Sequence, residues 1–420
     1  MNDVSENQSP LLENSLSSWL LTTGWAFNSM SELVEGFARQ LLEEGIPVTR
    51  LRVTLRTLHP QLVGVTYTWQ RDKKEIEKFE APHSILASDQ YLKSPYAGIF
   101  EGAGGMRRRL DIPDAEYEFP ILKELHDQGA TDYVAVPFHF RNGQINAMTI
   151  TTDRPGGFET GEIERIYNAL PALGRVVEPH AMERTARTLL ETYLGRHTGQ
   201  RVLKGLVKRG DGEDIYAVIW FCDLRDSTPL ADSMERAAFV ALLNDFFDCM
   251  AGSVLAHGGE VLRFIGDAVL AIFPMDVDRS TVERPSECPV HQETCTAAVA
   301  AARDATARLQ SLNLERAKRG EPPLGFGIAM HLGQVTYGNI GVPERLEFSV
   351  IGAAANEAAR LQSLCKELDR PVLASLEFAE VLPDIWTPLG AHTLRGVRAP
   401  REVFALAGSD SGNIAAPGSR

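Results

Sequence analysis

The chain has 420 residues, 44% of them hydrophobic and 23% charged, a composition that is ordinary for a globular protein and a length that favours two domains over one. Its formal net charge of −14 at pH 7 argues against general nucleic-acid binding, because no basic block balances the acidic excess, although a nucleotide substrate needs only a few local cations and a metal. The five scattered cysteines favour a reducing compartment over a disulfide framework.

Two further features concern membranes and location. No run of about 18 uncharged apolar residues occurs, so we expect no membrane span. The polar, acidic N-terminus lacks the order of a signal peptide, which favours a cytoplasmic protein. Residues 1–15 and 408–420 have the composition of disordered ends.

Residues 16–178 have the pattern of a small α+β domain. We expect a helix from about Trp19 to Glu44, strands at 51–55 and 62–69, a short helix near 119–125, a hairpin in which Asn142-Gly143 joins strands 133–140 and 145–150, and a closing helix at 160–177. This order resembles a GAF-type sensory domain in pattern, without a motif, and implies a regulatory domain for an unidentified ligand or partner protein. A structural domain without a ligand is the alternative. We interpret His139 as a packed or surface residue, not a haem or metal ligand.

Residues 179–213 read as a helical connector. The segment 182–194 has a helical pattern with an apolar edge formed by Leu189, Leu190 and Leu194, and glycines follow it. Such a helix is consistent with a dimer-forming signalling element and equally with a plain linker.

Residues 214–407 alternate strands and helices in the manner of an α/β sandwich with a mixed sheet. In chain order we expect a strand at 215–222, a helix at 233–257, a hairpin at Gly266-Asp267, a polar loop at 274–292, a helix at 294–317, strands at 325–331, 334–339 and 347–351, a helix at 353–368, a strand at 372–374 and a hairpin at 390–406.

Two carboxylates follow apolar strands in this half of the chain. Asp223 comes directly after the run 215–222, and Asp267 lies at the tip of the predicted hairpin. Carboxylates at adjacent strand ends can hold two divalent ions, which clamp a triphosphate and lower the pKa of an attacking hydroxyl. The alternative, a capping Asp and a turn Asp, is less consistent with both residues following buried strands.

The loop after Asp223 leads into a helix, so its free backbone N–H groups can receive phosphate oxygens. Asp226, Ser227 and Thr228 of this loop are therefore candidate substrate-binding residues. An acid facing a triphosphate would repel it, so we expect Asp226 to point away or to cap the following helix.

A second pair of polar residues, Asn356 and Arg360, lies four residues apart on the predicted helix 353–368 and thus on one face. A planar guanidinium suits a phosphoryl group that gathers negative charge. A solvated pair on an exposed face is the alternative.

Five segments follow one family pattern in order: FCDLRDST at 221–228, IGDAVLAIF at 265–273, GIAMHLGQV at 327–335, VIG at 350–352 with Asn356 and Arg360 behind it, and LRGV at 394–397. Together they resemble the class III nucleotidyl cyclase catalytic domain over about residues 214–407. The resemblance implies a ferredoxin-like catalytic domain, so the chain as a whole is expected to be α/β (α+β).

The resemblance also implies a homodimer with active sites between the subunits. Asp223, Asp267 and the backbone carbonyl of Leu224 of one chain would hold two Mg²⁺ or Mn²⁺ ions, and Asn356 and Arg360 of the other would orient the ribose and stabilise the transition state. Arg395 matches a position that contacts the terminal phosphates. The expected reaction converts ATP to 3′,5′-cyclic AMP and pyrophosphate.

Base specificity is left open by two departures from the pattern of adenylate-forming members. Arg263 replaces the usual Lys, and Ser349 replaces an Asp or Thr; a serine hydroxyl can bond to an amino group or to a carbonyl. A guanylate or pyrimidine nucleotide cyclase, or a catalytically silent nucleotide-binding module, are the alternatives to an adenylate cyclase regulated by the N-terminal domain. Cys288, His291 and Cys295 provide only three soft ligands, so we do not expect a zinc site there.

Overall fold

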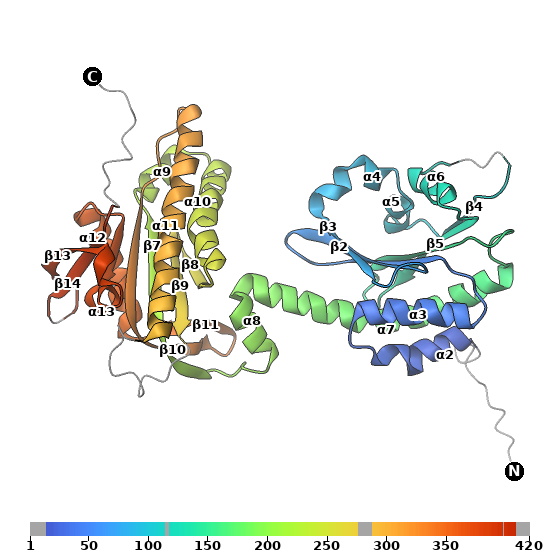
Figure 1. Ribbon diagram of the computed structural model, residues 1–420, viewed down its shortest axis with the longest axis horizontal. Helices are drawn as coiled ribbons and strands as arrows, with labels where there is room; N and C mark the ends of the chain where they lie inside the picture. The colour runs from blue at the N-terminus through green and yellow to red at the C-terminus, as the bar shows by residue number, and fades with distance from the viewer. Residues whose placement is uncertain (1–13, 114–116, 276–287, 398, 409–420) are drawn as a thin grey trace, which may run out of the picture. The chain divides into compact units, whose positions relative to one another are not determined.

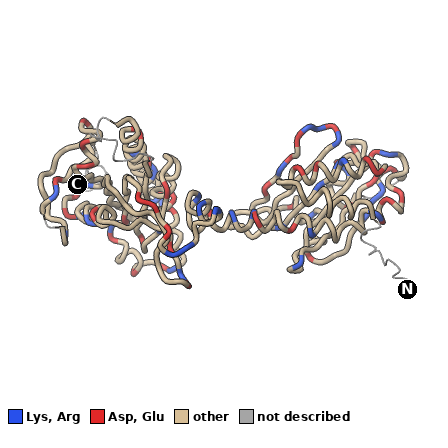
Figure 2. Tube along the Cα trace, turned by 90° about the horizontal axis from the view of Figure 1, so that it is seen from below, with Lys and Arg blue, Asp and Glu red and all other residues tan. Residues whose placement is uncertain are grey.

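The computed structural model describes residues 14–113, 117–275, 288–397 and 399–408 (Figure 1). The chain divides into two compact units, Met1–Leu189 and Leu190–Arg420. The ends that we expect to be disordered, and most of the polar loop expected at 274–292, lie outside the described residues. Basic and acidic segments are interspersed over both units (Figure 2), so the net charge of −14 is not gathered in one part of the chain.

The first unit is built on a six-stranded antiparallel sheet with the order β3-β2-β1-β6-β5-β4. Its strands are β1 (Arg50–Arg56), β2 (Leu62–Gln70), β3 (Glu77–Pro82), β4 (Met106–Arg109), β5 (Asp132–His139) and β6 (Ile145–Thr152). The predicted hairpin at Asn142-Gly143 is confirmed, since β5 and β6 pair antiparallel across it and Gly143 adopts a φ of 82°.

Helices cover both faces of this sheet (Figure 1). On one face lie α2 (Ser15–Thr22), α3 (Met30–Glu43) and α7 (Thr160–Leu194); on the other lie α4 (Asp89–Leu92), α5 (Pro95–Phe100) and α6 (Pro120–Asp127). Alternate residues of β1, Leu51, Val53 and Leu55, are buried with α3 and α7. The mixed α+β class expected for this half of the chain is confirmed.

The single helix expected from Trp19 to Glu44 is wrong. The segment forms α2 and α3 instead, with a short 3₁₀ turn at Gly24–Ala26 between them. Ser29 starts the second helix, because its hydroxyl accepts a hydrogen bond from the Glu32 N–H at 3.2 Å. The apolar periodicity continues across this break, which is why the sequence pattern concealed it.

Conversely, the two helices expected at 160–177 and 182–194 form one helix, α7, which contains Pro171 and Pro179. Each proline removes one N–H donor, but packing of buried residues such as Leu173 and Val177 against the sheet maintains the helix around them. Gly195, at a φ of 87°, ends α7, and α8 (Arg196–Leu203) follows.

The second unit contains an eight-stranded mixed sheet. Its order is β13-β14-β12-β10-β7-β9-β8, with β11 paired to β10. The strands are β7 (Gly212–Leu224), β8 (Glu260–Ile265), β9 (Ala268–Met275), β10 (Phe326–Val342), β11 (Arg345–Ile351), β12 (Val372–Ser375), β13 (Trp386–His392) and β14 (Arg401–Leu406). The hairpin at Gly266-Asp267 and the closing hairpin are confirmed.

The two strands expected at 325–331 and 334–339 are one continuous strand, β10, so that prediction is wrong. Gly333 interrupts the apolar pattern for a reason other than a turn. A Cβ there would lie 2.6 Å from the Ala354 Cβ, so the glycine permits close approach of a helix to the strand.

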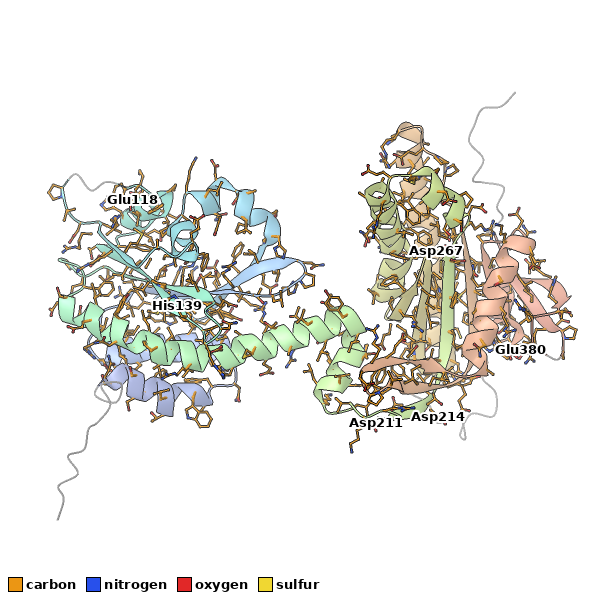
Figure 3. All side chains as sticks on the ribbon, turned by 180° about the vertical axis from the view of Figure 1, so that it is seen from behind. Glu118, His139, Asp211, Asp214, Asp267 and Glu380 are labelled. Carbon is orange, nitrogen blue, oxygen red and sulfur yellow. The ribbon has the colours of Figure 1, made fainter. Side chains whose placement is uncertain are left out.

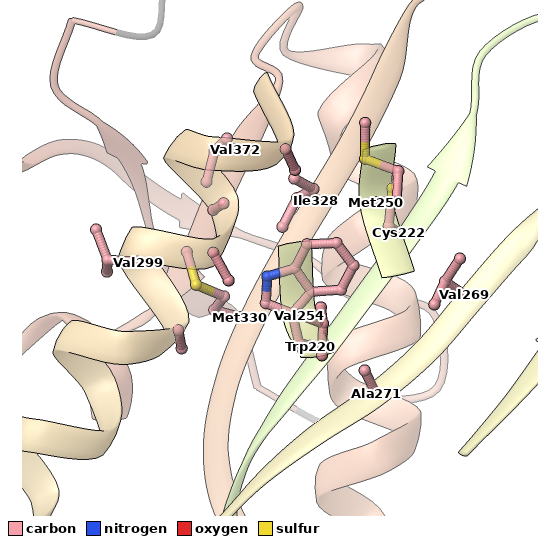
Figure 4. Packing of buried hydrophobic residues seen from close by; sticks show 14 of the residues in the cluster. Trp220, Cys222, Met250, Val254, Val269, Ala271, Val299, Ile328, Met330 and Val372 are labelled. Carbon is pink, nitrogen blue, oxygen red and sulfur yellow. The ribbon is translucent and has the colours of Figure 1, made fainter. Parts of the chain in front are cut away.

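Helices lie on both faces of this sheet as well. Its helices are α9 (Ser227–Ser233), α10 (Arg236–Ala256), α11 (Pro289–Lys318), α12 (Ala353–Glu367) and α13 (Leu376–Ala379). Strand β7 contributes Val218, Trp220 and Cys222 to the core shared with α10 and α11, and Ala217 and Ile219 to the cluster shared with α12. Figure 4 shows Trp220 at the centre of the first cluster, among residues of neighbouring strands and helices.

Helix α10 is, within the described part of the chain, the one helix whose length and composition would permit a membrane crossing. Its residues Leu242, Phe246, Met250 and Val254 are buried in the core of the second unit. It therefore packs as a core helix in this fold.

Replacing Trp220 by Ala removes a fully buried side chain (0% exposed) from the middle of this core. We expect the free energy of unfolding of the second unit to fall by about 3–5 kcal/mol, measured by equilibrium denaturation. Leu255→Ala is the control in the same unit: this side chain is 60% exposed, so the change should stay within about 0.5 kcal/mol. Equal effects of the two substitutions would contradict the core placement.

Candidate active site

Asp223 and Asp267 are brought together by the ladder between β7 and β9. Asp223 is the penultimate residue of β7 and pairs with Ala268, and Asp267 directly precedes that residue in the turn between β8 and β9 (Figure 3). Gly266 adopts a φ of 65°, the left-handed conformation that this two-residue turn requires. The sheet thus places the two carboxylates side by side, as the sequence led us to expect.

The electrostatics of the two carboxylates are coupled. The pKa of Asp223 is raised to about 6, mainly by partial burial and in addition by the neighbouring charge of Asp267 and a hydrogen bond with it. Two like charges held close together favour a shared proton or a cation between them.

A divalent cation fits this pair. Oxygen ligands are those that Mg²⁺ and Mn²⁺ prefer, and Mg²⁺ is usually bound by one or two carboxylates with its other positions left to substrate phosphates and water. Among the described residues no group of three or more His, Cys, Asp or Glu side chains could hold a metal, which leaves this pair without a third protein carboxylate. The Leu224 side chain is buried in the core (3% exposed), so only its backbone could face an ion here.

The loop after Asp223 is fastened by Arg225. Its guanidinium donates hydrogen bonds to the backbone oxygens of Cys365, in the last turn of α12, at 2.7 Å and of Arg370, just beyond that helix, at 3.1 Å. This residue positions the loop, and sequence reasoning missed it because its partners lie about 140 residues away.

Of the two placements expected for Asp226, pointing away from the phosphate loop or capping the following helix, the structure excludes the cap. Asp226 sits at the N-cap position with a φ of 55°, and its side chain makes no capping hydrogen bond. Its carboxylate pairs instead with the Lys366 ammonium of α12 at 2.7 Å, a hydrogen bond that lowers the pKa of Asp226. Ser227 and Thr228 begin α9, a helix of seven residues, and their contact with phosphate stays a prediction.

Asn356 and Arg360 lie on α12, as expected, one turn apart. Asn356 is exposed and Arg360 is half-buried. The Arg360 guanidinium packs against the turn at 394–397, where a Cβ added to Gly396 would lie only 2.9 Å from its Nη1. Arg395, the exposed residue before Gly396, therefore brings a second guanidinium-bearing residue to the same corner.

Arg263 and Ser349 differ in accessibility. Arg263 forms a two-pronged ion pair with Glu347, with 2.6 Å between Nε and Oε1 and 2.7 Å between Nη2 and Oε2. Ser349, two residues further along β11, is buried (3% exposed). Arg263 and Glu347 are thus the accessible polar groups at this position. Glu347 was missed, although its spacing of two from Ser349 on a strand was a usable signal.

The rejected zinc site at Cys288, His291 and Cys295 is not seen as a metal cluster among the described residues. These residues fall at the start of α11, not in the predicted loop. His291 and Cys295 are buried, and the His291 ring stacks on Tyr216 with 5.2 Å between the ring centroids.

Residues 213–383 match the family model of the adenylate and guanylate cyclase catalytic domain, which makes this segment a class III nucleotidyl cyclase domain. The GAF-type resemblance of residues 16–178 stays a prediction.

Curated relatives include an uncharacterised protein of Mycobacterium tuberculosis, 32% identical over 254 residues that make up 59% of this chain and 40% of that protein. Another, from Mycobacterium bovis, is 35% identical over 219 residues, which cover 52% of this chain and 34% of the relative. The chain thus spans well under half the length of these relatives.

Solved structures with similarity include the adenylyl cyclase CyaB from P. aeruginosa, 23% identical with a TM-score of 0.41, covering 48% of this chain and 97% of that one. The guanylyl cyclase Cya2 is 25% identical with a TM-score of 0.40, covering 48% of this chain and 96% of that one.

The raised pKa of Asp223 gives a stability prediction for the metal-free protein. An unfolded Asp titrates near pH 4 and folded Asp223 near 6, so the folded state loses stability as the pH rises through about 4 to 6. Asp223→Asn removes that loss. Because the group is half-exposed, solvent screening limits the gain at about pH 7.5 to roughly 1 kcal/mol, or about 2–4 °C in melting temperature.

The same substitution should change the melting temperature little at about pH 4, where the wild-type carboxyl is protonated. Mg²⁺ or Mn²⁺ should stabilise the wild type at about pH 7.5 and have a smaller effect on the variant. Asp232→Asn, an exposed position on α9, is the control and should behave as the wild type. A destabilising effect of Asp223→Asn at the higher pH would refute the coupled pair.

Proposed function

We propose that this chain is an adenylate cyclase that converts ATP to 3′,5′-cyclic AMP and pyrophosphate. The observation that carries the proposal is the coupled carboxylate pair, Asp223 and Asp267, at the strand ends of a class III cyclase domain. Two carboxylates held side by side, with the pKa of Asp223 raised by burial and by the charge of Asp267, are typical of a functional site.

In the proposed reaction the ribose 3′-oxygen forms a bond to the α-phosphorus, and the bond from that phosphorus to the bridging oxygen breaks, so pyrophosphate leaves. Asp223 and Asp267 would hold two Mg²⁺ or Mn²⁺ ions, which when bound supply charge neutralisation and a more acidic 3′-hydroxyl. Asn356 orients the ribose, Arg360 donates to phosphoryl oxygens as their charge grows, and Arg395 binds the terminal phosphates.

The active site is proposed to be shared between two copies of the chain. Large apolar side chains beside the carboxylate hairpin are exposed: Phe264 is 52% and Ile265 44% exposed. Exposed apolar residues grouped near a site support burial by a partner. A second copy that brings Asn356 and Arg360 to this hairpin would cover them.

A guanylate cyclase is the second candidate, and Glu347 is the observation that favours it. A carboxylate beside Arg263 can accept hydrogen bonds from two N–H donors, which the guanine edge presents and adenine does not. Adenine, with one amino group, needs one acceptor at this place, and the Arg263 guanidinium can donate to either base.

We further propose that the first unit regulates the cyclase domain and that the protein acts in the cytoplasm. The contacts of α8 support a coupling role for the segment that joins the units. The Thr198 hydroxyl is buried and lies 2.9 Å from Glu260 Oε1 and 2.7 Å from the Tyr337 hydroxyl. Glu260 begins β8, the strand that leads to Asp267, so a shift of α8 would be transmitted to the carboxylate hairpin.

The first test measures cyclic product from ATP, GTP, CTP and UTP with Mn²⁺, using the full-length protein and residues 200–420. We expect cyclic AMP as the main product. Asp267→Ala should lower the rate at least about 100-fold because it removes a metal ligand. Asp232→Ala, an exposed aspartate, should leave it unchanged. Product from GTP alone would establish the second candidate, and no product from any nucleotide would leave only a binding module.

A mixing experiment tests the shared site. Asp267→Ala and Arg360→Ala should each be inactive alone, because each disables both sites of its own homodimer. Mixed in equal amounts and allowed to exchange, half of the dimers are hybrids with one intact site, so about a quarter of wild-type activity should return. If all site residues came from one chain, the mixture would stay inactive.

A further inference from the structure

A cavity of about 430 Å³ lies in the first unit, over the face of the sheet that carries α4 and α5. Its described lining comes from β1, β2 and β3, from the segment with α4 and α5 that follows β3, and from α6, β5 and β6. A volume of this size falls within the range that small-molecule sites occupy. The cavity belongs entirely to the first unit and is independent of the cyclase site.

The floor of the cavity is an unusual sheet face. Alternate residues of β1, Arg50, Arg52, Thr54 and Arg56, line it, while Leu51, Val53 and Leu55 between them face the core on the other side. The hydroxyls of Thr54 and Thr66 lie 3.1 Å apart on this floor. A central strand whose second face carries guanidinium groups in place of packing residues presents donors to the cavity.

Two of these arginines, Arg50 and Arg52, are half-buried and lack a counter-charge among the described residues. The Nε atoms of Arg50 and Arg52 are buried and have no hydrogen-bond partner, and neither side chain forms an ion pair with a residue that the structure describes. Burial lowers the pKa of Arg50, and the adjacent charge of Arg52 lowers it further. Leaving two cations unpaired on a buried sheet face is unfavourable unless an anion joins them.

The acidic residues near the cavity do not neutralise it. Four basic residues line it, Arg50, Arg52, Arg56 and Lys93, against the two acids Glu101 and Glu124; Lys93 pairs with Asp89 at 2.8 Å, so three arginines face two acids. The Glu124 carboxylate accepts a hydrogen bond from Gln128 and attracts Arg50 without pairing with it. A local excess of positive charge in a chain of net charge −14 makes this cavity selective for anions.

The remaining walls are apolar and aromatic. Phe79 and Leu86, which line the cavity, are 42% and 41% exposed, and Phe100 lies under the Arg56 guanidinium at 5.8 Å. The Arg52 guanidinium lies 5.7 Å from the centroid of Tyr96, whose hydroxyl is buried without a partner. The occupant therefore needs an apolar body as well as an anionic group.

We propose that this cavity binds a small organic anion, a carboxylate or a phosphate held by Arg50 and Arg52 and attached to an aromatic body that packs against Phe79 and Phe100. Strands β2 and β3 link the cavity to α7, because Arg184 of α7 donates to the Tyr67 hydroxyl of β2 at 3.0 Å and to Glu80 of β3, the residue after Phe79, at 2.7 Å. Binding of the anion in the cavity would therefore change the contacts of Arg184 and so the position of α7.

The binding test uses the full-length protein and four probes: benzoate, phenyl phosphate, inorganic phosphate and the neutral benzyl alcohol. Calorimetric titration should show binding of benzoate, of phenyl phosphate or of both, and which of them binds identifies the anionic group. Arg50→Gln and Arg52→Gln should each weaken that binding about tenfold or more, since each removes a charge-assisted contact. Arg39→Gln, on the outer surface of α3, should leave it unchanged.

The proposal is overturned if neither aromatic anion binds, if benzyl alcohol binds as tightly as they do, or if both arginine variants bind like the wild type. A measurement without any probe separates a ligand role from a structural one. Arg52→Met removes an unpaired charge and keeps the side-chain length, so the melting temperature of the probe-free protein should rise by about 2–4 °C. A lower melting temperature with unchanged probe affinity would make Arg52 structural and refute the site.

Discussion

The antiparallel pairing of β7 with β10 is the interaction on which the second unit depends. Every residue of β7 from Gly212 to Leu224 has a partner on β10. Both faces of β7 are buried, with Trp220 turned toward α10 and α11 and Ile219 turned toward α12. A strand held on both edges and both faces cannot shift, because one residue of slippage would reverse every side chain. This rigidity fixes the position of Asp223 at its end.

The cyclase site uses that rigidity to hold groups in an arrangement that is unfavourable on its own. Asp223 and Asp267 repel each other, yet the ladder between β7 and β9 prevents them from separating. Arg225 holds the following loop to the end of α12 through two backbone oxygens. Enzymes commonly hold functional groups in locally unfavourable arrangements that the stability of the surrounding fold maintains.

The first unit also holds like charges close together on a rigid sheet, but here the charges are positive. Arg50 and Arg52 lie on a central strand whose other face is packed in the core, so both side chains leave the strand on the cavity side and their charges stay near each other. Acids are paired at the cyclase site and cations at the cavity, each on a strand that the core immobilises. In both units the sheet therefore acts as the rigid support, and the unmatched charge marks the side on which a ligand of opposite charge is recognised.

The sequence by itself determined the elements that local patterns encode. The apolar run before Asp223, the Gly266-Asp267 and Asn142-Gly143 turns and the one-face spacing of Asn356 and Arg360 all depend on neighbours within a few residues, and the structure has them as expected. Where an element's bounds depended on packing against residues distant in sequence, the sequence pattern predicted them wrongly. The break between α2 and α3 lies within one apolar periodicity, and Gly333 permits the approach of α12, which is remote in sequence.

Only the tertiary structure decided which charges meet. Asp226 pairs with Lys366, and Arg263 pairs with Glu347. Arg225 donates to backbone oxygens at the end of α12. Each of these contacts joins residues at least 84 positions apart. The alternating Arg50, Arg52 and Arg56 are visible in the sequence, yet a solvent-exposed strand would show the same pattern. Their burial beside a cavity depends on the sheet order and on the helices that cover it, because long-range packing decides whether a charge is solvated or left without a partner.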